Sequence, residues 1–459
     1  MQLKQYIGNK TFYKTALTVA MPIMLQNFIT NLVSMLDNLM VGALGTEQMS
    51  GVSIVNQLIF VFNLAIFGAM GGVGIFTAQF FGRKDYDGVR YTLRCKLYAA
   101  ALIFAVGLVV LLAVPEPLIS LFLHDENNTG SVALTMGFAR DYLGVILLGL
   151  APFAFSQAFA ATLRETGDTF TPMITGVVAV AVNCAFNWLL IFGHWGFPQM
   201  GVKGAAVATV LSRYVEFAII TGYAFAKRRR FPYMRGLFRG FSISREVLSA
   251  VLKKGTPLLC NEILWSAGMS TLNVAYSLHG LSVVAANSIS STVTNLFYIA
   301  FLSLGVSIGI LSGNLLGAGK HEEAVDTVKK MIAFSVFVSV VMGAVLFAFG
   351  GEIPKLYKTS AESRELAAYF IRVCACISPL VAFSNASYFT LRSGGKTLVT
   401  SLFDCGTLWV FYVPVAFGLY YLFHLPIRAV FPIVQAIELL KVIVGYVLVK
   451  KRVWVKTII

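Results

Sequence analysis

Long apolar stretches follow one another along the whole chain, and short polar connections separate them. An α-helix needs about 20 residues to cross the hydrocarbon core of a bilayer, and each stretch is long enough to do so. The strands of a membrane β-barrel alternate apolar and polar residues, so they would not give continuous apolar runs. The pattern therefore predicts an all-α integral membrane protein with twelve transmembrane helices, at about residues 15–41, 50–81, 92–114, 133–162, 170–193, 201–226, 249–276, 284–316, 327–349, 363–391, 397–421 and 427–449.

Composition agrees with this pattern and argues against catalysis. Of the 459 residues, 57% are hydrophobic and only 12% are charged, whereas soluble domains are typically about 25% charged. The cysteines form no CxxC motif and no ligand cluster with histidine, so we interpret them as small packing residues. The histidines are predicted to lie in loops, away from candidate nucleophiles. We expect no enzyme activity, no cofactor and no bound metal.

The charge pattern predicts the orientation in the membrane. The formal net charge is +15, and basic residues gather in every second connection, for example in residues 83–96, 227–240 and 450–456. By the positive-inside rule these connections and both termini are cytoplasmic. We therefore expect a monomeric, multi-pass protein of the bacterial cell membrane, whose basic side meets anionic lipids rather than nucleic acid. The first apolar run lacks a small-residue cleavage site, so we expect it to remain in the mature protein.

The two halves of the chain repeat one another. Pro22 and Pro257 open corresponding helices, since 257 − 22 = 235, and Gly82 and Gly317 share that offset. Farther along, TLRETGDT (162–169) matches TLRSGGKT at an offset of 390 − 162 = 228. Six helices in each half predict parallel repeats around a central cleft, which suits alternating access. We predict a six-helix N-terminal lobe at 1–226, a cytoplasmic basic linker at 227–248 and a six-helix C-terminal lobe at 249–459.

A single carboxylate, Asp37, interrupts the apolar stretch NLVSMLDNLMVGALG (31–45). A charged aspartate in the middle of a membrane helix costs about 2.5 to 3.5 kcal/mol on insertion scales. Burial favours the protonated form of a carboxyl group. We therefore predict that Asp37 binds and releases a proton, or that it helps to coordinate Na⁺. The structural alternative is an acid at the helix end that water keeps hydrated.

Polar side chains on two later helices are candidates for the same site. Asn183 and Asn187 are four residues apart, so both amides share one helix face. They can hydrogen-bond a carboxylate, or they can hold helices together without any further role. Thr209 follows small residues that permit close packing, and its hydroxyl can also bond back to its own helix.

The second half offers Glu262, which lies near the middle of the membrane, five residues after Pro257. Asn261 and Trp265 flank it. An acid beside an aromatic ring suits a lipophilic cation, through charge and cation–π attraction, and pairing with a basic side chain elsewhere is the alternative. Asp404 is a further candidate acid, while Glu216 with Arg213 and Glu438 with Lys441 are predicted local ion pairs. Additional cavity polarity is predicted from Gln57, Gln157 and Asn287.

These residues together resemble the multidrug and toxic compound extrusion (MATE) family. The resemblance is carried by DNLMVGALG (37–45), NCAFNWLLIFG (183–193), GVKGAAVAT (201–209) and the twin LRxxG elements at 163–167 and 391–395. It implies an antiporter that exports amphipathic, often cationic, drugs or metabolites while H⁺ or Na⁺ enters. It also implies that Asp37 is the coupling carboxylate, that Asn183, Asn187 and Thr209 belong to its hydrogen-bond network, and that the first helix bends at Pro22. From the residues themselves we expect substrate contacts around Glu262 and a second hinge at Pro257.

The chain departs from the family pattern in ways that bear on the coupling ion. Asn187 stands where one branch usually has an aspartate, and Trp265 stands where another usually has its acid. The stretch SPLVAFS (378–384) is neutral where that second branch has a further acid. Because Asp37 lacks a dense set of additional carboxylates, we favour H⁺ over Na⁺.

Other functions remain open at this point. A flippase for lipid-linked oligosaccharides would need a cationic cavity, but no Arg or Lys is predicted deep within the first, second, seventh or eighth helix. A facilitator of the other large twelve-helix class is disfavoured, because GRKDYDGVR (82–90) matches its loop signature poorly. A channel is disfavoured because the sequence has no filter-like loop. A receptor or scaffold is disfavoured because the sequence has no extended soluble domain.

Overall fold

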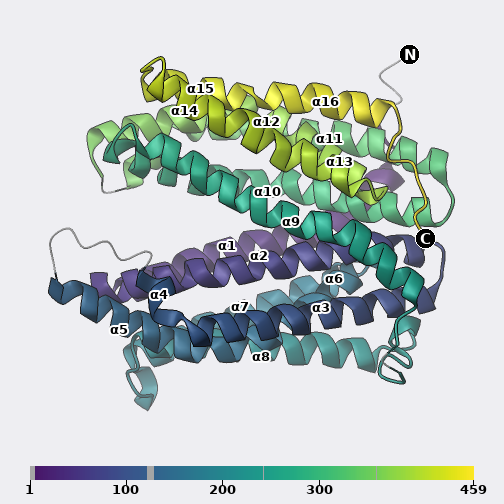
Figure 1. Cartoon of the computed structure of the whole chain (residues 1–459), viewed down its shortest axis with the longest axis horizontal. Coiled ribbons are helices and arrows are strands. Elements are labelled where there is room, and N and C mark those ends of the chain that lie inside the picture. The colour runs from purple at the N-terminus through teal and green to yellow at the C-terminus, as the bar shows by residue number, and fades with distance from the viewer. Residues whose placement is uncertain (1–5, 121–128, 241, 358) are drawn as a thin grey trace. The chain divides into compact units, whose positions relative to one another are not determined.

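The computed structural model describes residues 6–120, 129–240, 242–357 and 359–459. Within these ranges every regular element is helical (Figure 1). The apolar periodicity seen in the sequence is thus realised as membrane-length helices joined by short turns. The all-α prediction is confirmed.

The described residues of the first half form eight α-helices, two of which are joined end to end. The fourth predicted span, at 133–162, is split into α5 and α6 by a short 3₁₀ turn at Leu147–Gly149. The helices are α1 (Lys10–Gly42), α2 (Thr46–Gly82), α3 (Tyr86–Ala113), α4 (Pro115–Ser120), α5 (Thr129–Ile146), α6 (Leu150–Glu165), α7 (Phe170–Phe192) and α8 (Val202–Ala226).

Where the structure describes the second half, that half also forms eight α-helices, and one of its spans is irregular. The span predicted at 397–421 contains two π-helical segments, Leu402–Gly406 and Leu408–Tyr412. The helices are α9 (Arg245–Ser277), α10 (Leu281–Gly317), α11 (His321–Phe349), α12 (Ala361–Ser393), α13 (Thr397–Ser401), α14 (Val413–Tyr421), α15 (Ile427–Ala436) and α16 (Glu438–Lys450).

Eleven stretches of described helix are long and apolar enough to cross a membrane. The twelfth predicted span is α9, which has 33 residues and is more polar because it contains Asn261 and Glu262. Pro257 lies inside this helix, and its carbonyl oxygen accepts a hydrogen bond from Ser401 Oγ at 3.1 Å. The polar residues that make α9 a candidate for function are therefore also the ones that lower its hydropathy.

The chain groups into two compact units. We call Leu25–Thr77 with Tyr86–Ala250 the N-unit, and the described residues up to Met24, Ala78–Asp85 and Val251–Ile459 the C-unit. Helix α1 passes from the C-unit to the N-unit after Met24, two residues beyond Pro22, which lies inside that helix. A proline removes one backbone hydrogen bond from a helix, so α1 is weakened close to where the chain changes unit.

Each unit has its own apolar core. In the N-unit, Val55, Ile66 and Ala154 are completely buried. In the C-unit, the rings of Phe370 and Phe431 stack with centroids 4.0 Å apart. Lipid tails are as apolar as these side chains, so van der Waals packing within each bundle, and not removal from water, holds its helices together.

A pair of glycines in the C-unit reflects the internal duplication. A Cβ at Gly82 would lie 1.9 Å from the carbonyl oxygen of Asn314, and a Cβ at Gly317 would lie 1.9 Å from that of Gln79. The two contacts share one offset, because 317 − 82 = 235 and 314 − 79 = 235. Only glycine permits such an approach of two backbones. The repeat predicted from the sequence therefore appears as two equivalent crossings.

Candidate functional site

Helices α7 and α8 of the N-unit approach each other closely at Gly204. A Cβ at this position would lie 2.5 Å from the carbonyl oxygen of Leu190. The small residues of GVKGAAVAT (201–209) therefore let the two backbones meet. This packing brings Thr209 Oγ1 on α8 to 3.2 Å from Asn183 Nδ2 on α7.

A chain of hydrogen bonds continues from this contact to α1. Thr209 Oγ1 donates to the carbonyl oxygen of Ala205 at 3.0 Å and accepts from Asn183 Nδ2. Asn183 Oδ1 accepts from Asn187 Nδ2 at 3.2 Å, and the same amide nitrogen donates to Asp37 Oδ1 at 2.7 Å. The four residues that the sequence assigns to ion coupling thus lie together.

The direction of these hydrogen bonds determines what the chain can do. Asn183 and Asn187 are 5% and 1% exposed, so their amides are held largely out of contact with water. A hydrogen bond to an ionised carboxylate is roughly twice as strong as one between neutral groups. Protonation of Asp37 therefore weakens the link between α1 and α7. The network is a connection whose strength depends on the charge of one carboxyl group.

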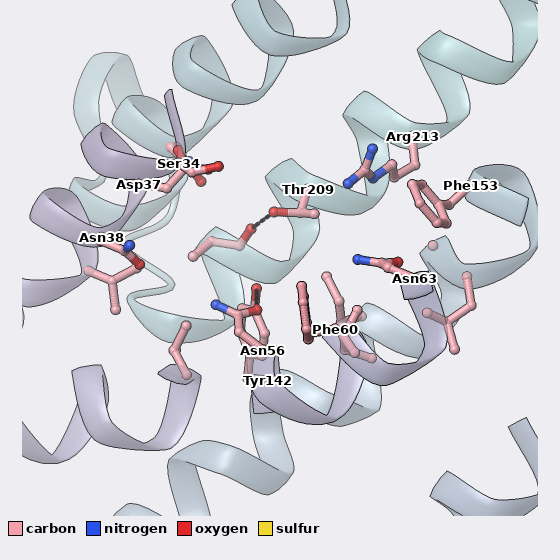
Figure 2. Close-up of a pocket in the computed structure, with 18 residues that line it drawn as sticks. Ser34, Asp37, Asn38, Asn56, Phe60, Asn63, Tyr142, Phe153, Thr209 and Arg213 are labelled. Atoms are coloured by element: carbon pink, nitrogen blue, oxygen red, sulfur yellow. Dashed lines mark hydrogen bonds between the residues drawn. The ribbon is translucent and has the colours of Figure 1, made fainter. Parts of the chain in front are cut away.

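Asp37 also lines a cavity of about 320 Å³ within the N-unit (Figure 2). This volume lies at the lower end of the range for small-molecule sites. Thr209 and Arg213 project from one helix into the cavity, and the hydroxyl of Tyr142 donates to Asn56 Oδ1 at 3.3 Å. Among the described residues, the cavity is thus lined by one carboxylate, that of Asp37, one guanidinium, that of Arg213, and several neutral polar groups.

Arg213 belongs to the cavity as well as to its predicted ion pair. Its guanidinium lies 3.3 Å from Glu216, as the predicted ion pair requires, and 4.5 Å from the centre of the Phe153 ring. It also lines the cavity that contains Asp37. Because it follows Thr209 by four residues, the helical period places it on the same face. No comparable signal pointed to Tyr142, because its position depends on how the helices pack.

The C-unit contains a second polar cluster, centred on Asp404. This acid lies in the π-helical segment Leu402–Gly406, an irregularity frequent at functional sites. Lys441 Nζ donates to Asp404 Oδ1 at 3.2 Å, and Asn261 Nδ2 donates to Oδ2 at 3.4 Å. Lys441 also lies 4.0 Å from Glu438. The predicted local pair is therefore present, but the lysine lies closer to Asp404.

Glu262 lies near a basic residue in the same unit. Its carboxylate is 3.9 Å from the guanidinium of Arg392, with side-chain exposures of 25% and 14%. Arg392 belongs to the second LRxxG element, so the pairing that the sequence left open is made between α9 and α12. Trp265 is 37% exposed. Binding of a cationic compound by Glu262 stays a prediction, and Arg392 would compete for its charge.

The other predicted polar residues lie apart from the Asp37 cavity. Gln57 is exposed and Gln157 is buried, and neither lines the cavity. Asn287 Nδ2 donates to Asn273 Oδ1 at 3.1 Å in the C-unit. Across the part of the chain that the structure describes, no group of three or more His, Cys, Asp or Glu residues could hold a metal ion.

Comparison with known protein families decides the identity of the chain. The family model described as MatE matches residues 22–189 and again residues 257–417. The chain belongs to the MatE family. The two matches begin 257 − 22 = 235 residues apart, which is the offset of the internal repeat. Membership of this transporter family, with the many membrane-length helices, establishes an integral membrane protein.

Relatives of this MatE protein carry names from drug resistance. A protein of Thermotoga maritima named "Probable multidrug resistance protein NorM" is 28% identical over 413 residues, covering 90% of this chain and 86% of the relative. A protein of Bacillus subtilis named "Probable multidrug resistance protein YoeA" is 26% identical over 438 residues, covering 93% and 91%.

Solved structures share the fold of this MatE protein. One is described as "Outward-facing conformation of a multidrug resistance MATE family transporter of the MOP superfamily", with a TM-score of 0.86 and 20% identity over 98% of this chain and 97% of the other. Another, "Crystal structure of MATE in the bent conformation", has a TM-score of 0.86 and 20% identity over 96% and 95%. The predicted membrane-spanning helical fold is confirmed.

Proposed function

We propose that this MatE protein is an H⁺-coupled antiporter that exports amphipathic, often cationic, compounds from the cell. The observation that carries the proposal is the 2.7 Å hydrogen bond from Asn187 to Asp37 at the edge of a polar cavity. Family membership and the names of the relatives support drug efflux as the transported activity. The protein would act in the bacterial cell membrane as a monomer with both termini in the cytoplasm.

The coupling step follows from the charge dependence of the network. With Asp37 ionised, the amide of Asn187 ties α1 to α7. A proton on Asp37 removes the charge that strengthens this bond, and α1 is then freer to bend at Pro22, where a backbone hydrogen bond is missing. Alternating access requires such a link between ion binding and helix geometry, since a ligand shifts a conformational equilibrium only by its differential affinity for the two states.

The identity of the neighbouring atoms favours H⁺ over Na⁺. Asn187 presents an N–H donor to Asp37, and a donor repels a metal cation. A Na⁺ site would need several oxygen ligands around the carboxylate, as hard cations prefer. The cavity also includes Arg213, whose positive charge opposes a second cation. A proton needs only a single acceptor oxygen.

The lipid-linked oligosaccharide flippase remains the alternative from the same superfamily. Such an activity calls for several cationic groups that hold a pyrophosphate. In the Asp37 cavity the charge of Arg213 is balanced by the nearby Glu216 and faces Asp37. We therefore place drug export ahead of lipid flipping.

Ethidium uptake into inside-out vesicles tests the proposal. With an imposed proton gradient and no Na⁺, we expect uptake by the wild type and loss of at least about 90% of it in Asp37→Asn, because the amide cannot bind a proton at ordinary pH. Asp87→Asn is the matched control, since Asp87 has a side-chain exposure of 71% and pairs with Arg90 at the surface. Equal uptake by Asp37→Asn and the wild type, at equal protein levels, would show that Asp37 does not couple transport.

A further inference from the structure

The basic connection after α8 is folded against the N-unit. Arg94 on α3 donates from all three of its guanidinium nitrogens, to the carbonyl oxygens of Leu237, Ser242 and Gly236, each at 2.9 Å. Tyr233 is 1% exposed. These contacts hold residues 227–240 in one arrangement, so their arginines have defined positions.

An apolar groove of about 360 Å³ lies beside this connection. Its walls come from α3, α6, α8 and the connection itself, and aromatic rings dominate them. The rings of Phe155 and Phe217 are 6.4 Å apart, and the ring of Phe238 stacks on Phe225 at 5.8 Å. Arg94 is the one charged residue among those that line the groove in the described part of the chain. Its positive charge disfavours the cationic compounds that we propose for transport.

The groove is continuous with a face of α3 that meets the membrane. Tyr98, Leu102 and Val106 are four residues apart, so they form one stripe along the helix. They are 43%, 66% and 55% exposed. Exposed apolar side chains on a membrane-spanning helix contact lipid acyl chains, and Tyr98 is also part of the groove lining. An acyl chain can therefore enter the groove directly from the bilayer.

Positively charged residues adjoin two of the groove's lining residues in the chain. Arg235 and Arg239 flank the lining residues Leu237 and Phe238, and both arginines are exposed. Among the ion pairs between described residues, the arginine of 227–240 that has a carboxylate partner is Arg230, which lies 3.7 Å from Asp168. Guanidinium groups bind phosphate well because their donors match its oxygens. Basic pockets between membrane helices on the cytoplasmic side are known to bind anionic head groups.

We propose that this groove binds an anionic phospholipid of the inner leaflet. One acyl chain lies along the aromatic walls, and the phosphate contacts Arg235 and Arg239. The lipid fastens the connection to the ends of α3, α6 and α8. The site lies on residues distinct from those that line the Asp37 cavity, so the proposal does not depend on the transported substrate.

Native mass spectrometry of the purified full-length protein tests this site. The protein is titrated with dioleoyl phosphatidylglycerol and, in parallel, with dioleoyl phosphatidylethanolamine. We expect the anionic lipid to bind about 25-fold more tightly, and Arg235→Gln with Arg239→Gln to remove most of that preference, since each basic residue near a membrane contributes about 1 kcal/mol, or roughly fivefold. Ala101→Trp, which fills the groove, should reduce binding of the lipid by a similar factor.

The controls separate the groove from general surface charge. Lys450→Gln with Lys451→Gln removes the same charge from exposed positions elsewhere and should leave binding unchanged. Phe238→Ala trims a ring that is 59% exposed and provides a second groove variant if Ala101→Trp does not fold. If the control pair loses as much lipid binding as Arg235→Gln with Arg239→Gln does, the proposed site is wrong. Arginine dependence without any effect of the groove variants, or displacement by millimolar glycerol phosphate, would likewise overturn it, since the acyl chain would have no role.

Discussion

The N-unit and the C-unit each bury carboxyl groups within helices, but they satisfy them with different partners. In the N-unit, Asp37 accepts a hydrogen bond from a neutral amide, Asn187, at 2.7 Å. In the C-unit, Asp404 accepts from the ammonium group of Lys441 at 3.2 Å. The two acids do not occupy equivalent positions of the internal repeat, because Asp37 lies in α1 and Asp404 lies in the π-helical segment Leu402–Gly406.

The difference determines which acid can change its charge. When Asp37 takes up a proton, its amide partner remains neutral, and Arg213, which lines the same cavity, keeps its ion pair with Glu216. When Asp404 takes up a proton, the ammonium group of Lys441 loses a negatively charged partner. A mostly buried cation with fewer carboxylate partners is unfavourable. The N-unit is therefore suited to titration during transport, and the C-unit cluster is suited to holding helices in position.

The largest expected effect is on the C-unit cluster. Lys441→Met leaves Asp404 and Glu438 without their cation, and breaking a buried ion pair from one side typically destabilises a protein by about 3 to 5 kcal/mol. We expect a clear drop in the melting temperature of the protein in detergent, with Lys450→Met at an exposed position as the matched control.

A compensating variant checks the cause of that drop. Combining Lys441→Met with Asp404→Asn and Glu438→Gln removes the uncompensated charges, so most of the stability should return. If Lys441→Met melts like the wild type, the C-unit acids do not depend on this lysine and the contrast between the units fails.

An intermediate effect is expected on transport from the amide network. Asn187→Leu removes the donor to Asp37, and a hydrogen bond to a charged group is worth about 1.5 to 3 kcal/mol. We expect proton-driven ethidium uptake to fall about tenfold or more. Asn287→Leu is the matched change in the C-unit, where the amide bonds only another amide, Asn273, and uptake should fall by less than about threefold. Similar losses in both variants would contradict a special role for the Asp37 network.

The smallest effect is expected from Glu262. Its 3.9 Å contact with Arg392 is long and partly exposed, so the pair contributes below about 1 kcal/mol. Glu262→Gln should retain the pH dependence of uptake that Asp37→Asn loses, although its affinity for a cationic compound is expected to decrease. Loss of pH dependence in Glu262→Gln, with Asp37 intact, would move the coupling site to the C-unit.

Local patterns were sufficient for much of the helical fold and of the N-unit site. Continuous apolar runs predicted the spans. The span predicted at 363–391 corresponds to α12, Ala361–Ser393, and the span predicted at 170–193 corresponds to α7, Phe170–Phe192. The spacing of Asn183 and Asn187 predicted a shared face, and both amides take part in the network with Asp37. These features follow from the helical period and from the low polarity of a bilayer.

Partners on distant helices could not be predicted in the same way. The pairs Lys441 with Asp404 and Arg392 with Glu262 each join two helices. Asp404 lies in a π-helical segment. The apolar pattern of this stretch did not distinguish it from an ordinary α-helix. Many basic residues were available as partners, and sequence spacing does not rank them.

The sequence by itself determined that this is a duplicated, helical membrane protein with one conspicuous acid in its first span, because hydropathy and periodicity are properties of a single helix. Tertiary structure decided which groups surround each acid: the amide of Asn187 for Asp37, with Arg213 in the same cavity, and the ammonium group of Lys441 with the amide of Asn261 for Asp404. That choice depends on how helices pack and rotate against one another, and electrostatic interactions act over the resulting distances rather than over positions in the chain.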